Sequence, residues 1–129
     1  MTKNQKYEHW LDIATYDLET AEAMLSGGRW LYVAFMCQQA VEKLVKGLYT
    51  LYIDDNIPRI HNISALIKPI PVEVPKEKFI LFDTLSAYYI NNRYPEFMAK
   101  LSSRVTEKEA TKILAQTKEV FSWLLTLKP

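Results

Sequence analysis

The chain contains a single cysteine and lacks any long uninterrupted run of apolar residues. One cysteine excludes an intrachain disulfide, which fits a reducing cytoplasm. A membrane-spanning helix needs about 20 consecutive apolar residues, and no segment approaches that length. The first ten residues mix lysine and glutamate with polar residues and do not resemble a signal peptide. We therefore expect a cytoplasmic protein that neither spans nor binds a membrane.

An excess of one charge is also absent, because 16 basic residues stand against 15 acidic ones and the net charge is +1. A protein dedicated to duplex DNA usually carries a basic excess. Any anionic partner must therefore bind to a local patch rather than to the whole surface. The 129 residues fit one domain over residues 1–129. A chain of this size buries about two thirds of its surface without a disulfide or a metal.

Apolar residues recur at intervals of three and four through most of the chain, which predicts helices. We find neither the alternation typical of strands nor an internal repeat. Asn62 can cap a short helix, and Thr106 with Glu109 forms a capping-box pattern. The predicted fold class is all-α, an up-and-down helical bundle of four longer helices plus one short helix. The expected spans are 3–26, 28–52, 63–68, 76 to near 91–92, and 107 to about 127, with an irregular or weakly helical segment at 93–105.

Residue patterns that mark common enzyme sites are mostly missing. The sequence has no glycine-rich phosphate loop after a strand, no Walker lysine and no nucleophile elbow. The two histidines, His9 and His61, lie in separate segments without Cys, Asp or Glu at metal-ligand spacing, so we expect surface or turn histidines. We therefore predict no metal site and no cofactor.

The predicted helix over residues 28–52 carries a continuous apolar stripe and a compact polar cluster. The stripe predicts that this helix is the central element of the core, with Cys37 as a buried thiol. Gln39, Lys43 and Lys46 share one helix face, and Glu42 stands four residues before Lys46, the favourable order for an ion pair. Two interpretations stay open: a solvent face with one ion pair, or a basic edge whose two ammonium groups hold phosphate oxygens. The cluster consists of Gln38, Gln39, Glu42, Lys43 and Lys46.

A second candidate element is the run Asn92-Arg93-Tyr94-Pro95, at the end of a predicted helix. A cation at a helix C-terminus interacts well with the helix dipole, which would be a structural role for Arg93. Alternatively, a planar guanidinium beside a ring and a proline would suit a base or phosphate held at a rigid turn. Both roles stay open from the residues alone.

Four stretches in this order resemble the HEPN family, the small helical domains of prokaryotes and higher eukaryotes. They cover residues 14–96, and the run Gln-Gln-Ala-Val-Glu-Lys followed by Arg-Tyr-Pro is the most specific part. The stretches are Tyr16-Asp17-Leu18 with Ala21-Glu22 and Met24-Leu25; Gly28-Arg29-Trp30 with Ala34-Phe35 and 38–46; His61-Asn62-Ile63 with Leu66; and Tyr89 with 92–96.

The resemblance implies a helical bundle that usually forms a homodimer and handles RNA or nucleotides. Many relatives are metal-independent ribonucleases, toxins paired with a small nucleotidyltransferase antitoxin, or parts of defence systems. Their active site uses an arginine followed, after four to six residues, by a histidine.

This sequence departs from that motif. If Arg93 is the family arginine, the histidine should stand at position 98, 99 or 100, but these positions hold Met98, Ala99 and Lys100. Arg59 and His61 are separated by one residue and do not match the spacing. Loss of an imidazole general base typically lowers a rate by about 10²- to 10⁴-fold. We therefore do not expect a nuclease of the usual type.

The resulting prediction is a HEPN protein that binds a nucleotide or RNA phosphate and acts with a minimal nucleotidyltransferase partner in a toxin–antitoxin-like or defence pair. Lys43, Lys46 and Arg93 would contact the anion, and Tyr94 would offer a stacking surface. A first alternative is a metal-independent ribonuclease with a displaced general base, in which Arg93 is catalytic.

A second alternative is a non-catalytic interaction module whose aromatic surface binds a protein partner. Eight tyrosines, five phenylalanines and three tryptophans exceed what one small core easily hides. Aromatic side chains are enriched at interfaces, so we also expect a homodimer. The residues expected at such a surface are Tyr7, Trp10, Tyr49, Tyr52 and Trp123.

Overall fold

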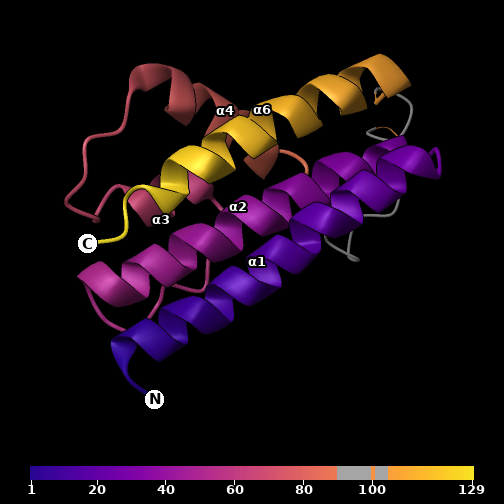
Figure 1. Cartoon of the computed structure of the whole chain (residues 1–129). Coiled ribbons are helices and arrows are strands. Elements are labelled where there is room, and N and C mark those ends of the chain that lie inside the picture. Colours follow the sequence, from indigo (N-terminus) through magenta and orange to yellow (C-terminus); the bar gives the residue numbers. More distant parts are fainter. Residues whose placement is uncertain (90–99, 101–104) are drawn as a thin grey trace.

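The computed structural model describes residues 1–89, 100 and 105–129, and these residues form helices without a strand (Figure 1). This arrangement confirms the all-α fold class. None of the helices in the described ranges is long and apolar enough to cross a membrane. The helices are α1 (Lys3–Ser26), α2 (Trp30–Tyr52), α3 (Ile63–Ile67), α4 (Lys76–Ser86) and α6 (Glu107–Leu125).

Helix α1 has the predicted bounds because both of its ends are set by local residues. At its start, the Thr2 hydroxyl accepts a hydrogen bond from the Gln5 backbone, and the Gln5 side chain accepts one from the Thr2 backbone. At its end, Gly28 takes φ +72°, a left-handed conformation that glycine adopts without steric cost. The chain then reverses, so α2 begins at Trp30 and runs antiparallel beside α1 (Figure 1).

Helix α2 is the central element, as the apolar stripe predicted. It packs against α1, α3, α4 and α6 (Figure 1). Cys37, Leu44 and Leu48 are fully buried, and each large apolar side chain buried in this way contributes about 1.5–3 kcal/mol. Burial extends beyond the stripe, because fourteen of the 23 residues of α2 are buried, polar ones included.

Helix α4 ends at Ser86, about five residues before the predicted end. The Ser86 hydroxyl donates to the Phe82 carbonyl at 2.8 Å and accepts from the Ile63 backbone at 3.1 Å. This second bond ties the last turn of α4 to the first residue of α3. The backbone then tightens through bonds from Tyr88 to Leu85 and from Tyr89 to Ser86. The early end of α4 therefore depends on a tertiary contact, which the spacing of apolar residues in the sequence does not predict.

The starts of α3 and α6 follow the predicted caps. The Asn62 side chain accepts from the Ala65 backbone at 2.9 Å at the start of α3. At the start of α6, the Thr106 hydroxyl accepts from the Glu109 backbone at 3.1 Å, one of the two bonds of the predicted capping box. One face of α6 is buried, and Leu125 at its end is 39% exposed; the buried residues include Ala110, Ile113, Leu114, Thr117, Phe121 and Leu124.

Candidate functional site

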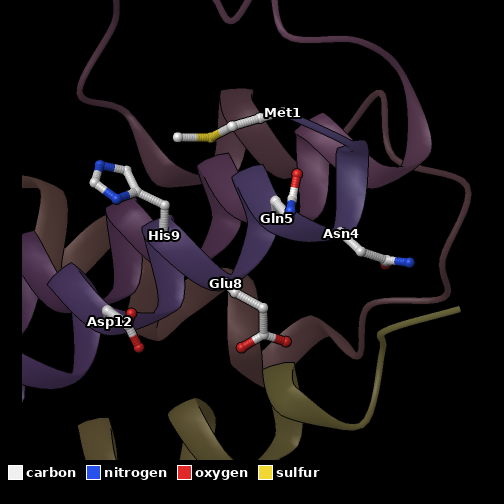
Figure 2. Close-up of a pocket in the computed structure, with 6 residues that line it drawn as sticks. All are labelled: Met1, Asn4, Gln5, Glu8, His9 and Asp12. Atoms are coloured by element: carbon white, nitrogen blue, oxygen red, sulfur yellow. The ribbon is translucent and has the colours of Figure 1, made fainter.

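The outer face of the first turns of α1 forms an open hollow of about 540 Å³. Figure 2 shows that the side chains of Glu8, His9 and Asp12 point in different directions from this one helix. Across the described ranges, no group of three or more His, Cys, Asp or Glu side chains could hold a metal ion. The polar side chains of this hollow therefore do not converge on one point where a ligand or metal could bind.

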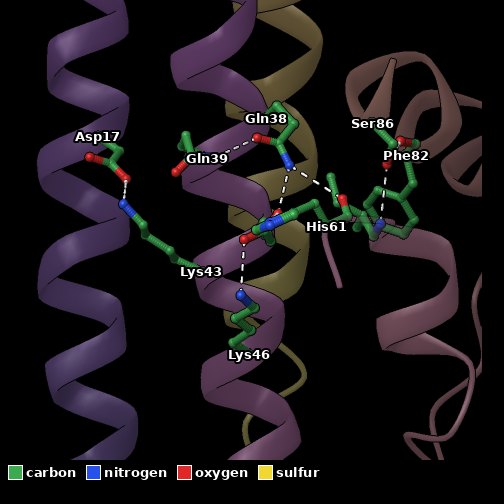
Figure 3. A network of polar contacts seen from close by, with 10 residues as sticks. Asp17, Gln38, Gln39, Lys43, Lys46, His61, Phe82 and Ser86 are labelled. Carbon is green, nitrogen blue, oxygen red and sulfur yellow. Dashed lines mark hydrogen bonds and ion pairs between the residues drawn. The ribbon is translucent and has the colours of Figure 1, made fainter. Parts of the chain in front are cut away.

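A buried carboxylate organises a different part of the surface. Glu42 of α2 is 3% exposed, and its two oxygens accept three hydrogen bonds or ion pairs (Figure 3). The Gln38 side-chain amide lies 2.8 Å from Oε1, and His61 Nδ1 lies 3.0 Å from the same oxygen. The Lys46 ammonium lies 3.0 Å from Oε2, which is the ion pair predicted from the acid-first spacing. A buried carboxylate is tolerated because its partners replace the hydrogen bonds of water.

The position of this network corrects the solvent-face interpretation of the polar cluster. Gln38, Glu42 and Lys46 stand four residues apart and therefore lie along one row of α2. Gln38 is fully buried, and its carbonyl oxygen accepts a bond from the Gln39 amide at 2.7 Å. The row faces the segment around His61 rather than water, since the Gln38 amide also lies 3.4 Å from the His61 carbonyl. Helical spacing gives the row correctly but does not show which segment covers it.

His61 has partners that its sequence context did not reveal. Its ring stacks on the Tyr89 ring, with centroids 3.7 Å apart and planes inclined by 11°. The residue after it, Asn62, is fixed as the cap of α3. The side chain nevertheless stays 44% exposed. A histidine in a turn is thus held on one edge by a carboxylate and on one face by an aromatic ring, while part of it meets solvent.

The two lysines predicted to hold an anion pair with different carboxylates. Lys43 forms an ion pair with Asp17 of α1, whose side chain is 9% exposed. Lys46 pairs with Glu42 and lies 6.0 Å from the centroid of the Trp10 ring. Figure 3 shows Lys43 directed toward Asp17, whereas Lys46 lies beside the His61 network. The two ammonium groups therefore do not converge on one point.

Lys46 also borders a pocket of about 300 Å³ between α1 and the segment that follows α2. Trp10 provides an aromatic wall, and Arg59 provides a guanidinium that is exposed and has no ion-pair partner among residues 1–89, 100 and 105–129. Asp55 on the rim pairs with Lys6, and this hydrogen-bonded ammonium lowers the pKa of the Asp55 carboxyl. The pocket is lined by Trp10, Lys46, Asp55, Asn56, Ile57, Pro58 and Arg59.

Two predicted site residues, Arg93 and Tyr94, lie outside the described residues. Sequence reasoning missed the contact between Glu42 and His61, which are 19 residues apart. The available signal was weak: one acidic residue in the polar cluster of a largely apolar helix, and a histidine directly before a helix cap. Neither feature identifies the other as its partner without the tertiary structure.

Comparison with known proteins places this arrangement in a family. A family model described as the HEPN domain matches residues 7–127. The crystal structure of TT1696 from Thermus thermophilus matches with a TM-score of 0.82 and 27% identity, over 94% of this chain and 97% of that one. ST0689, an archaeal HEPN homologue, matches with a TM-score of 0.76 and 27% identity, over 95% and 98% of the two chains. No curated protein matches. The chain is a member of the HEPN family.

Proposed function

We propose that this HEPN protein binds a nucleotide or RNA phosphate at the surface around Glu42. The observation that carries the proposal is that one buried carboxylate holds both Lys46 and His61, beside the stacked ring of Tyr89. The Lys46 ammonium beside an aromatic ring suits a phosphate attached to a base. Arg93 and Tyr94 follow Tyr89 by four and five residues in the sequence, and we propose them as the principal phosphate and stacking contacts.

Lys43 is a secondary contact in this proposal. Its ammonium is half-buried and already paired with Asp17, so a phosphate would have to compete with a nearby carboxylate. Lys46 faces the same competition from Glu42, but it also borders the pocket with Trp10 and with Arg59, which has no ion-pair partner in the part of the chain that the structure describes. The cationic part of the site is therefore expected to depend most on the arginines.

The proposal extends to partners. We propose that residues 1–129 form one HEPN domain that acts as a cytoplasmic homodimer with a minimal nucleotidyltransferase, in a toxin–antitoxin-like or defence pair. The support for an interface is apolar surface on two sides of the bundle: Tyr16 is 70% exposed on α1, and Ile80 is 61% exposed on α4. The support for the partner and for the pair is the membership of the HEPN family.

The aromatic surface expected for a pure interaction module needs a correction. Tyr7 and Tyr49 are buried in the core, with 1% and 9% exposure, so they cannot contact a partner protein. The other three, Trp10, Tyr52 and Trp123, are half-buried, and Tyr52 and Trp123 pack against the core. The apolar residues that remain open to a partner are different ones, Tyr16 and Ile80 among them.

Replacing Arg93 with alanine tests the binding proposal. We expect Arg93→Ala to abolish binding of a fluorescently labelled short RNA, measured by anisotropy, while Tm stays nearly unchanged. The matched control is Arg29→Ala, because Arg29 is exposed and its side chain makes no cap bond at the start of α2. Equal RNA affinity in the Arg93→Ala and wild-type proteins would overturn the proposal, as would a large loss of stability without a change in affinity.

A further inference from the structure

The middle turn of α4 carries apolar side chains in every direction around the helix axis. Successive residues of a helix are turned by about 100°, so the run Phe79-Ile80-Leu81-Phe82 covers the whole circumference. Phe82 is fully buried in the core, whereas Ile80 is 61% exposed. An apolar belt of this kind is typical of a helix that is covered on all sides. Within the described ranges α4 packs mainly against α2 and α3, so its side at Ile80 stays open to a partner.

A groove of about 250 Å³ lies beside this turn, between α4 and α6. Its apolar floor consists of Leu81, which is half-buried, and Val120, which is 2% exposed. Ile80 precedes Leu81 and stands three residues after Glu77, so it lies on the same side of α4 as these two lining residues. The exposed apolar side chain therefore extends the floor toward solvent. The residues that line the groove are Glu77, Lys78, Leu81, Gln116, Glu119 and Val120.

The charged groups of the groove leave it with an excess of negative charge. The Lys78 ammonium lies 4.9 Å from the centroid of the Trp123 ring, a cation–π contact that joins α4 to α6. Glu77 on α4 and Glu119 on α6 are both exposed, and neither has an ion-pair partner among the residues that the structure describes. Carboxylates on both walls of an apolar floor favour an occupant that is apolar along one side and cationic along its edges.

We propose that this α4–α6 groove binds a cationic amphipathic helix of a partner protein. The described residues contain no strand, so an extended peptide finds no sheet edge to pair with, whereas a groove between two helices accepts a third helix. The apolar side chains of the partner helix cover Ile80 and Leu81. Its lysines or arginines pair with Glu77 and Glu119. The groove shares no residue with the network around Glu42, so this inference is independent of the proposed nucleotide site.

Two fluorescein-labelled synthetic helical peptides with the same leucine face test the proposal, one with lysine and one with glutamate at the remaining positions. Anisotropy with the full chain should show binding of the lysine peptide and weaker binding of the glutamate peptide, by about tenfold or more. Glu119→Lys should weaken the lysine peptide by about tenfold and strengthen the glutamate peptide. The matched control is Glu19→Lys, which changes the net charge equally on an exposed position of α1 outside the groove.

Ile80→Ser tests the apolar half of the groove. It should weaken the lysine peptide by about tenfold with Tm unchanged, because Ile80 is exposed in the free protein. Absence of binding by the lysine peptide would overturn the proposal, as would equal binding of the two peptides or equal effects of Glu119→Lys and Glu19→Lys. Conversion of a dimer into single chains by Ile80→Ser would also overturn it, because this surface would then be covered by a second copy of the chain.

Discussion

Cys37 lies in the core where α2 packs on α6, and burial raises the pKa of its thiol to about 11. The neighbouring Thr117 hydroxyl and the charge of Lys118 offset only part of this increase. An unburied cysteine has a pKa near 8.5, and the thiolate is its reactive form. At neutral pH, Cys37 is therefore a protonated and unreactive core residue, as its place on the apolar stripe predicted.

The raised pKa predicts how stability changes at high pH. The native state keeps the Cys37 proton above about pH 8.5, whereas the unfolded state releases it. This contribution is therefore fully present below about pH 8.5 and is lost as pH rises through about 11, up to about 3 kcal/mol in all. Urea unfolding from about pH 7 to about pH 10.5 should show a smaller fall in the free energy of unfolding for Cys37→Ala than for wild type. Parallel curves for the two proteins would contradict the assignment.

Glu42 and Glu22 show that the same residue type takes different roles according to burial. Both carboxylates pair with a lysine, but the Glu22–Lys118 pair is half exposed, and such pairs contribute less than about 1 kcal/mol. Glu42 is almost fully buried, so the folded state is stable only when its hydrogen-bond and ion-pair partners are in place. Only the buried carboxylate can hold a neighbouring side chain in a fixed orientation.

At the scale of elements, α1 and α2 approach closely where α2 has no side chain. A Cβ atom placed on Gly47 would lie 3.0 Å from Trp10 Cβ and 3.2 Å from Tyr7 Cδ2. The Trp10 Cβ is attached to the α1 backbone and cannot move independently of it. The missing side chain at Gly47 therefore sets how closely the two helices pack, and with that the position of Trp10 beside Lys46.

A larger residue at this contact should separate the helices. We expect Gly47→Val to lower the free energy of unfolding by about 1–3 kcal/mol through overpacking, although valine favours a helix more than glycine does. Chemical denaturation provides the measurement. In the control variant Gly27→Val, the new Cβ meets only the Ala23 and Met24 carbonyl oxygens at 3.4 and 3.8 Å, so the change should stay within about 0.5 kcal/mol. Equal effects at the two glycines would show that the α1–α2 contact is not tight.

At the scale of the whole molecule, the exposed apolar residues leave the bundle with surface that a partner can cover. Tyr16 and Ile80 lie on different helices and are both more than half exposed. Single apolar residues on a surface are common, so exposure alone does not define an interface. The proposed homodimer therefore needs a direct measurement of mass.

Light scattering at micromolar concentration provides that measurement. A homodimer should give a mass of about 30 kDa, twice the 15.1 kDa of one chain. Tyr16→Ser and Ile80→Ser remove apolar area without disturbing the core, and the variant at the interface should shift the mass toward that of one chain. A wild-type mass of one chain across the concentration range would contradict dimerisation.

The sequence predicted most of the helices because their signals are local. The bounds of α1 were correct at both ends, since Thr2, Gln5 and Gly28 act within a few residues of the chain. The end of α4 was wrong, because the bond from the Ile63 backbone to Ser86 comes from a distant segment. Of the two interpretations that the sequence left open for the polar cluster, the solvent face was wrong for Gln38 and Glu42, which are buried.

What the sequence determined by itself was the helical class, the central position of α2, the caps and the Glu42–Lys46 pair. Each of these depends on residues within about one or two helical turns of each other. The tertiary structure alone decided that Glu42 is buried and that His61 and Tyr89 meet beside it. The physical reason is that a helical period fixes directions around one axis, whereas the choice of neighbour depends on how separate segments share the core.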